Sequence, residues 1–267
     1  MITYKYRLNP SEETATLLSE EQIDTCRQLY NHTRYQYTVA PKGDKPSEYD
    51  QINQLPQLKN KWPELKSVHS QVLQETVGRF YDNLSRLSKK KEKGHSVGML
   101  KWKPPREYRS ITYVQSGFKL NNTSDQSDEQ STLWLSKVGD ILIRYHRPLP
   151  EGEIKQVTIK QTPANEWYAC LVVEEDAEPP EKPPIEDLSD EEMVGIDVGI
   201  LSYAHDTTGL AVKSLDVSET QNRLEREQRS LSRKEYGSNN WEKQRVKVAE
   251  IHSRLKRQRH DFLHKLS

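Results

Sequence analysis

The sequence has few residues of several kinds, and each shortage excludes a class of protein. Among 267 residues it has two cysteines, Cys26 and Cys170, which lie far apart and in no Cys-x-x-Cys pair. Neither a disulfide framework nor a zinc site is therefore indicated. No stretch approaches the length of about 18 apolar residues that a membrane-spanning helix needs. The first residues lack the pattern of a signal peptide, so we expect a cytoplasmic protein without a membrane partner.

The chain has no net charge, but its acidic and basic residues are concentrated in different parts of the sequence. Residues 174–192 contain ten acids, four prolines and one lysine, a composition that cannot build a core and predicts a linker. Residues 79–109 contain ten Lys or Arg against three acids, and residues 222–265 contain thirteen against six. A single basic run is usually a solvated helix face, but clusters of this kind favour a polyphosphate partner.

Residues 11–94 have the apolar spacing of helices. Ser19 and Gln22 form the pattern of a capping box at the start of one helix, and residues 40–50 are expected to form a loop. A longer helix is expected to start near Ser67. Its apolar stripe has a regular spacing and consists of Leu73, Val77, Phe80, Leu84 and Leu87.

Two other parts of the chain alternate between apolar and polar residues, as strands do. Residues 1–8 form one such segment, and several short ones follow between residues 110 and 173, with a polar loop at 121–131. Short strands at this spacing indicate a small antiparallel barrel. The first segment is expected to join this barrel, which makes the helical region an insertion.

Residues 193–200 read as a further strand, with Val194, Ile196 and Val198 on one face. Asp197 points to the other face, although aspartate is depleted inside strands. One interpretation is a metal ligand on a stiff strand, flanked by glycines that leave room for an ion. The other interpretation is a strand that ends early, with Asp197 opening a turn. A hairpin turn at 207–209 and two helices, near 218–235 and 239–265, are expected to follow.

Several stretches resemble the TnpB family, the insertion-sequence transposase B group that is ancestral to type V CRISPR effectors. They occur in the family's order along the whole chain. The stretches are Tyr4–Pro10, Cys26–Asn31, Ser70–Gln74, His146–Leu149, Val194–Gly199 and Arg259–Leu266.

The resemblance implies an α+β multidomain fold. It consists of a small antiparallel β-barrel, called the wedge, with an inserted helical recognition domain, followed by the N-terminal part of an RNase H-like (RuvC) α/β domain. The implied boundaries are 1–10 with 110–176 for the wedge, 11–109 for the recognition domain, 177–192 for the linker and 193–267 for the RuvC part.

The family resemblance also implies a guide-RNA-directed DNA endonuclease that uses Mg²⁺ or Mn²⁺. Two ions are held by an Asp, a Glu and a second Asp, and Asp197 matches the first of these. The second and third carboxylates and the family's zinc ribbon do not occur before Ser267. We therefore expect a truncated family member that is inactive alone. Asp206, Asp216 and Glu219 are weak substitutes, because turn and cap roles usually explain such positions.

The resemblance implies two partners, a guide RNA and target DNA. The basic stretches are expected to contact them. No oligomeric state is predicted. The candidate nucleic-acid-binding residues are Lys89, Lys90, Lys91, Lys93, Lys101, Lys103, Arg106, Arg254, Lys256, Arg257 and Arg259.

Three alternatives remain from the sequence. A non-catalytic RNA- or DNA-binding regulator would keep the basic surfaces without cleavage, and a decayed product would have no function. An actin-like or sugar-kinase ATPase also begins its phosphate loop with Gly-Ile-Asp-x-Gly. In that class a Thr or Ser follows, whereas Ile200 and Leu201 follow here, so this reading is disfavoured.

Overall fold

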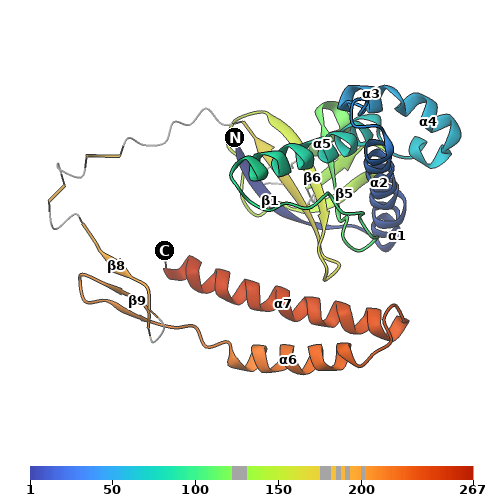
Figure 1. Ribbon diagram of the computed structural model, residues 1–267. Coiled ribbons are helices and arrows are strands. Elements are labelled where there is room, and N and C mark those ends of the chain that lie inside the picture. The colour runs from blue at the N-terminus through green and yellow to red at the C-terminus, as the bar shows by residue number, and fades with distance from the viewer. Residues whose placement is uncertain (122–130, 175–181, 185–187, 190–192, 200–201, 267) are drawn as a thin grey trace. The chain divides into compact units, whose positions relative to one another are not determined.

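The computed structural model describes residues 1–121, 131–174, 182–184, 188–189, 193–199 and 202–266. Contacts divide the chain into two units, residues 1–176 and residues 177–267 (Figure 1). The division falls inside the acidic, proline-rich stretch that the sequence predicts as a linker. Most of that stretch, and most of the predicted polar loop at 121–131, lie outside the described residues.

The first unit is built around an antiparallel sheet of seven strands. They are β1 (Ile2–Asn9), β2 (Ser110–Val114), β3 (Phe118–Asn121), β4 (Thr132–Leu135), β5 (Gly139–Arg144), β6 (Ile154–Gln161) and β7 (Trp167–Val173). Their order across the sheet is β2-β6-β7-β1-β5-β4-β3. The N-terminal strand thus lies in the middle of the sheet, and the helical region comes between β1 and β2 in the chain.

The sheet curls into a barrel-like shape that is nearly closed. Its two outer strands, β2 and β3, are joined directly by the short 3-10 helix η3 (Gln115–Gly117). At this corner the Gly117 carbonyl accepts a hydrogen bond from the Ser136 N–H at 2.9 Å. A Cβ atom on Gly117 would lie 3.1 Å from the Tyr113 ring and 3.3 Å from the His69 imidazole, so close packing explains this glycine.

The inserted region consists of several helices of different kinds. They are α1 (Glu12–Thr16), the π-helix η1 (Leu17–Ile23), α2 (Asp24–Val39), α3 (Glu48–Asn53), α4 (Leu55–Lys61), the 3-10 helix η2 (Pro63–Lys66) and α5 (Ser70–Glu92). The apolar stripe predicted for the long helix is confirmed in α5. Leu73, Val77 and Phe80 are buried there, and Leu84 packs against the same core.

Two local predictions in this region are wrong. Ser19 caps no helix, because it lies inside η1, where its hydroxyl donates to the Thr16 carbonyl at 3.2 Å. The capping box lies instead at Ser47 and Asp50, whose side chains each accept from the other's backbone N–H. Helix α3 therefore starts within residues 40–50, which the sequence predicts as loop.

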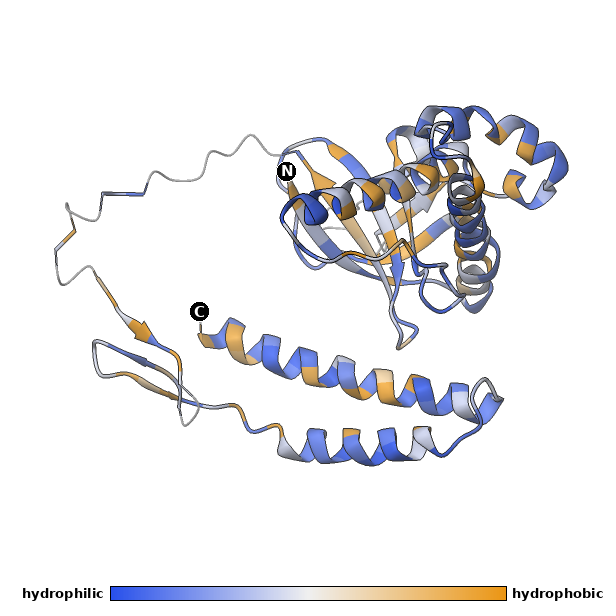
Figure 2. Ribbon diagram, viewed as in Figure 1, coloured by the Kyte–Doolittle hydropathy of each residue, from blue (hydrophilic) through white to orange (hydrophobic). Residues whose placement is uncertain are grey.

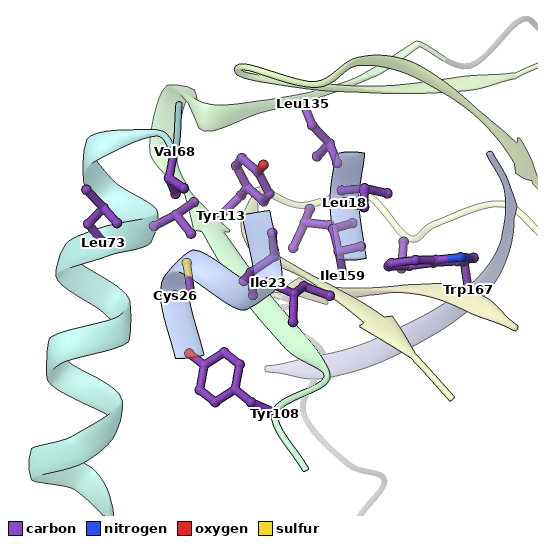
Figure 3. Close-up of a cluster of buried hydrophobic side chains, with 14 of the residues drawn as sticks. Leu18, Ile23, Cys26, Val68, Leu73, Tyr108, Tyr113, Leu135, Ile159 and Trp167 are labelled. Carbon is purple, nitrogen blue, oxygen red and sulfur yellow. The ribbon is translucent and has the colours of Figure 1, made fainter. Parts of the chain in front are cut away.

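The helices and the inner face of the sheet share one hydrophobic core (Figure 3). Leu18, Ile23 and Cys26 from the helices are buried in it. They lie among side chains of the strands, including Tyr113 and Ile159 (Figure 3). Burial raises the pKa of the Cys26 thiol to about 11, so Cys26 is a packing residue and not a reactive thiol.

The second unit contains a small sheet and two helices. They are β8 (Ile196–Asp197), β9 (Ser202–Asp206), β10 (Ala211–Lys213), α6 (Ser218–Ser232) and α7 (Asn239–Leu266). Val248, Ile251 and Leu255 of α7 are buried, and apolar segments recur along this otherwise polar helix (Figure 2). The ring of Tyr203 on β9 packs edge-on against Phe262 of α7 at 5.2 Å between centroids.

No helix in the described part of the chain is both long and apolar enough to cross a membrane.

Candidate functional site

Asp197 lies on β8, at one edge of the sheet whose strand order is β10-β9-β8. The expected strand at 193–200 is shorter among the described residues 193–199, where β8 comprises Ile196 and Asp197, and the Gly199 N–H still donates to the Tyr203 carbonyl of β9 at 3.3 Å. Asp197 lies directly opposite His205, and both side chains are exposed. Residues directly opposite in an antiparallel pair share a face, so this face presents a carboxylate and an imidazole together.

The glycines on either side of Asp197 have a local packing role. The Gly195 N–H donates to the Thr207 hydroxyl at 3.2 Å, and the Thr207 N–H donates to the Gly195 carbonyl at 3.0 Å. A Cβ on Gly195 would lie 3.0 Å from the Thr207 methyl group, and one on Gly199 would lie 3.2 Å from the Ser202 carbonyl oxygen. These glycines therefore make room for neighbouring parts of the chain, whatever else approaches this face.

The small sheet and the end of α7 also form an open groove that is lined mostly by apolar residues. Ile196 and Val198 are 68% and 67% exposed. They line a groove of about 780 Å³ together with Ala204, Val212 and Leu263 of α7. His205 also lines this groove, whereas Asp197 is not among its lining residues.

The weak substitutes for the family's other carboxylates have the turn and cap roles that the sequence indicates. The Thr208 hydroxyl donates to Asp206 at 2.7 Å and lowers the pKa of that carboxyl. The Leu210 N–H also donates to Asp206, at 2.8 Å, and completes the turn. Asp216 accepts from the Ser218 N–H at 2.9 Å at the start of α6, and this bond lowers its pKa.

The described residues contain no group of three His, Cys, Asp or Glu that could hold a metal ion. Asp197 fits as one ligand for a hard cation such as Mg²⁺ or Mn²⁺, which prefers carboxylate oxygens. His205 is a second possible ligand on the same face. Two-metal hydrolysis needs more carboxylates than this, so these residues match such a centre only in part.

The lysines predicted to bind nucleic acid at the end of α5 are all exposed: Lys89, Lys90, Lys91 and Lys93. They lie beyond the buried part of the apolar stripe, in the last helical turn and just after it. Cations are favourable at the C-terminus of a helix, which is the simpler explanation of their position. Their side chains are nonetheless free of any packing role.

The predicted basic residues after α5 have more structural roles. The backbone of Lys103 holds this segment to α2, because its N–H donates to Asn31 and its carbonyl accepts from Asn31 and Arg27. The Lys103 ammonium lies 4.0 Å from Glu107. Lys101 is exposed, beside Trp102, which is 54% exposed, whereas Arg106 is half-buried.

The predicted basic residues of α7 surround its buried stripe. Arg254, Lys256, Arg257 and Arg259 are exposed, whereas Leu255 between them is buried. They belong to the second unit, and the residues of α5 belong to the first. The predicted basic residues therefore lie on both units.

A further basic cluster, within the basic stretch 222–265, lies on α6 and just after it. Arg226, Arg229, Arg233 and Lys234 line a hollow of about 510 Å³ on α6 together with Ser230. Arg226, Arg229 and Arg233 recur every three to four residues, which places them on one helix face. This spacing is visible in the sequence and could have found them.

Residues 170–267 match the OrfB_IS605 family, described as probable transposase. Two curated proteins are similar over 99% of this chain. One, "Putative RNA-guided DNA endonuclease" of Streptomyces pristinaespiralis, is 32% identical. The other, "Putative RNA-guided DNA endonuclease InsQ" of Escherichia coli (strain K12), is 28% identical. The chain spans 62% of the length of each of these relatives.

The matched segment contains the strand that bears Asp197 and the elements that follow it. Asp197, the small sheet and both long helices of the second unit lie inside residues 170–267. The similarity to the two relatives extends further and includes the barrel-like sheet and its inserted helices. Residues 170–267 therefore match an OrfB_IS605 transposase domain, and the resemblance of the chain to the TnpB family is confirmed.

Proposed function

We propose that this chain binds a guide RNA and, through it, a DNA target. The observation that carries this proposal is the similarity, over 99% of the chain, to two proteins whose names describe RNA-guided DNA endonucleases. The exposed lysines at the end of α5 and the exposed cations of α7 support it, because clustered Lys and Arg neutralise phosphates.

The arrangement of elements supports the domain roles that the family suggests. The barrel-like sheet of the first unit is the wedge, and the helices inserted between β1 and β2 are the recognition part. In the second unit a strand bearing Asp197, a hairpin and long helices follow one another. This order is that of the start of an RNase H-like, or RuvC, domain, and we assign it so as part of the proposal.

Asp197 is the proposed metal ligand of this domain. A divalent ion held there would activate water and stabilise charge on phosphate oxygens. The described residues supply Asp197 and at most His205 on that face, so no catalytic step follows from them. A second candidate function, a regulator that binds RNA or DNA without cutting, is favoured by this shortage of carboxylates.

The proposal is tested with the 267-residue chain itself. RNA that co-purifies with the chain is sequenced, transcribed again and titrated against the chain, with a scrambled RNA of the same length as control. The expected result is tighter binding of the co-purified RNA, and binding of a complementary DNA only when this RNA is present. Equal, weak binding of both RNAs would contradict a guide-binding function.

The same complex is incubated with the matching DNA and Mg²⁺ or Mn²⁺. We expect no cleavage, because one carboxylate leaves a divalent ion weakly held and the leaving oxygen without a second metal. Cleavage that survives Asp197→Ala would show that other carboxylates form the centre. Cleavage that Asp197→Ala abolishes would show that residues outside the described part complete the site around Asp197.

A further inference from the structure

A row of polar side chains crosses five neighbouring strands of the seven-stranded sheet. The strand register places these residues directly opposite one another: Ser110 on β2, Lys160 on β6, Tyr168 on β7, Arg7 on β1 and Arg144 on β5. Residues in such a row share one face of the sheet. Their neighbours along the strands, such as Leu8 and Ile143, are buried in the core. The row therefore lies on the outer face of the barrel-like sheet.

Arg7 and Arg144 in this row are like charges placed directly opposite each other. Such a pair destabilises a sheet, so the sheet alone gives no reason for it. Glu166 offsets one of the two charges, because its carboxylate pairs with Arg7 at 2.9 Å. The Tyr168 hydroxyl also donates to Glu166, at 3.3 Å. Glu166 thus neutralises the charge of Arg7. No ion pair among the described residues neutralises the charge of Arg144.

Two lysines add to the surplus of positive charge. The Lys5 ammonium lies 3.7 Å from the centre of the Tyr168 ring. Lys160 lies directly opposite Tyr168 on the neighbouring strand β6. Lys5, Lys160 and Arg144 are exposed. The side chains of Lys160 and Arg144 form no hydrogen bond or ion pair with the other residues that the structure describes. Four cations, Lys5, Arg7, Arg144 and Lys160, thus lie on this face, and Glu166 pairs with Arg7 among them.

We propose that this outer face, formed by Lys5, Arg7, Arg144 and Lys160, binds the phosphodiester backbone of a nucleic-acid strand. The inference rests on the proposed function, and it adds a phosphate-binding surface to the basic stretches of α5 and α7. Neighbouring strands are about 4.8 Å apart, so the row from Lys160 to Arg144 spans about 14 Å. A strand of duplex carries one phosphate per about 3.4 Å of helix axis, so this span matches about four phosphates.

A nucleic acid fits this face better than an acidic protein does. The cations of the row stand on three of four neighbouring strands of a stiff sheet, which suits an extended partner with a charge at every repeat. Arginine can bind phosphate oxygens through two parallel hydrogen bonds. RNA and DNA share this chemistry, and the outer face itself reads phosphates and not bases.

The test measures binding of the full 267-residue chain to a labelled RNA strand and to a DNA strand of the same sequence, over a range of salt concentrations. The variant carries Arg144→Ala and Lys160→Ala. Each lost phosphate contact lowers the dependence of log affinity on log salt by about 0.7 for a single strand, so the double variant should lower this slope by about 1.4. The control carries Lys42→Ala and Lys66→Ala, two exposed lysines outside the sheet, and should keep the slope.

Stability separates a binding role from a structural one. Arg144→Glu places an acid opposite Arg7, so it should weaken nucleic-acid binding without lowering the midpoint temperature of unfolding. A role in holding the sheet together would instead lower that temperature. A loss seen with RNA alone, or with DNA alone, supports the inference and identifies the strand that the face binds.

The contradicting outcomes are distinct. If the unaltered chain binds RNA or DNA and the double variant keeps its slope, the inference is wrong and the proposed function stands. If the unaltered chain binds neither strand, both are wrong. If polyglutamate binds as tightly as the nucleic acids and loses affinity equally in the double variant, the face belongs to an acidic protein partner and the inference is overturned.

Discussion

Asp197 on β8 and His205 on β9 lie directly opposite each other, so that a carboxylate and an imidazole share one exposed face of the small sheet. Two such ligands should hold a divalent ion weakly, since tight oxygen sites use several carboxylates. We expect added Mn²⁺ to broaden the nuclear magnetic resonance signals of the His205 ring by paramagnetic relaxation. Asp197→Asn should reduce this broadening strongly.

Asp216 provides the matched control for this measurement. It is also an exposed acid of the second unit, between β10 and α6, but it accepts a hydrogen bond from Ser218 at the start of α6. Asp216→Asn should leave the broadening at His205 unchanged. Broadening that is the same in all three proteins would show that Mn²⁺ binds elsewhere, and Asp197 would lose its assignment as a ligand.

The lysines at the end of α5 provide a second prediction. Changing Lys89, Lys90, Lys91 and Lys93 to Ala should weaken RNA binding and lower its salt slope by up to about 3, since each phosphate contact contributes about 0.7 on a single strand. These side chains are exposed and lie beyond the buried stripe, so the midpoint of thermal unfolding should change little. Anisotropy titrations and circular dichroism measure the two effects.

A control with equal charge loss shows whether position or charge matters. It changes four other exposed lysines of the first unit to Ala: Lys42, Lys61, Lys66 and Lys119. The control should retain most of the salt slope. If both variants lose the same slope, binding depends on total charge, and α5 has no special part in it.

The shared core of the first unit predicts that its helices and its sheet unfold together. Leu73 of α5 is fully buried in this core, and Leu73→Ala should lower the free energy of unfolding by about 2–5 kcal/mol. Hydrogen exchange followed by mass spectrometry should show faster exchange in β6 and β7 as well as in α2. Leu87→Ala, at the half-buried end of the same helix, should cost much less. Faster exchange confined to the helices would mean that they form a separate folding unit.

His69 predicts a pH effect on the stability of the first unit. Burial, Lys137 and Lys59 lower the pKa of its imidazole, which also stacks on Tyr113. The unfolded chain has the usual value of about 6.5 and binds a proton first as the pH falls. This contribution to stability is therefore complete above about pH 6.5 and is lost as the pH falls towards the lower pKa of the folded chain.

Removing one of the causes should move the titration. In Lys137→Gln the pKa of His69 should rise towards its usual value, because a positive charge beside the imidazole is gone. Resonances of the His69 ring, followed against pH, measure the change. Lys66→Gln, an exposed lysine that does not lower this pKa, is the control. An unchanged His69 titration in Lys137→Gln would leave burial and Lys59 as the causes.

Much of the local structure could be read from the sequence, because local structure depends on local patterns. Alternation of apolar and polar residues predicted β2, β4 and β7, and the apolar spacing predicted the buried side of α5. An aspartate within an apolar strand pattern identified Asp197 as the candidate ligand. Helix starts were less predictable, since the Ser19 pattern and the Ser47 pattern look alike and only the surrounding chain decides which one caps a helix.

Only the tertiary structure decided which distant residues share a face. Strand order and register depend on contacts between residues far apart in the chain, and no local pattern states them. Arg7 and Arg144 are unremarkable as single residues, and they become a like-charged pair because β1 lies beside β5. In the same way, Gly195 gains its packing role only when the hairpin brings Thr207 against it. The sequence by itself thus determined the elements and the family resemblance, whereas folding decided which of their side chains act together.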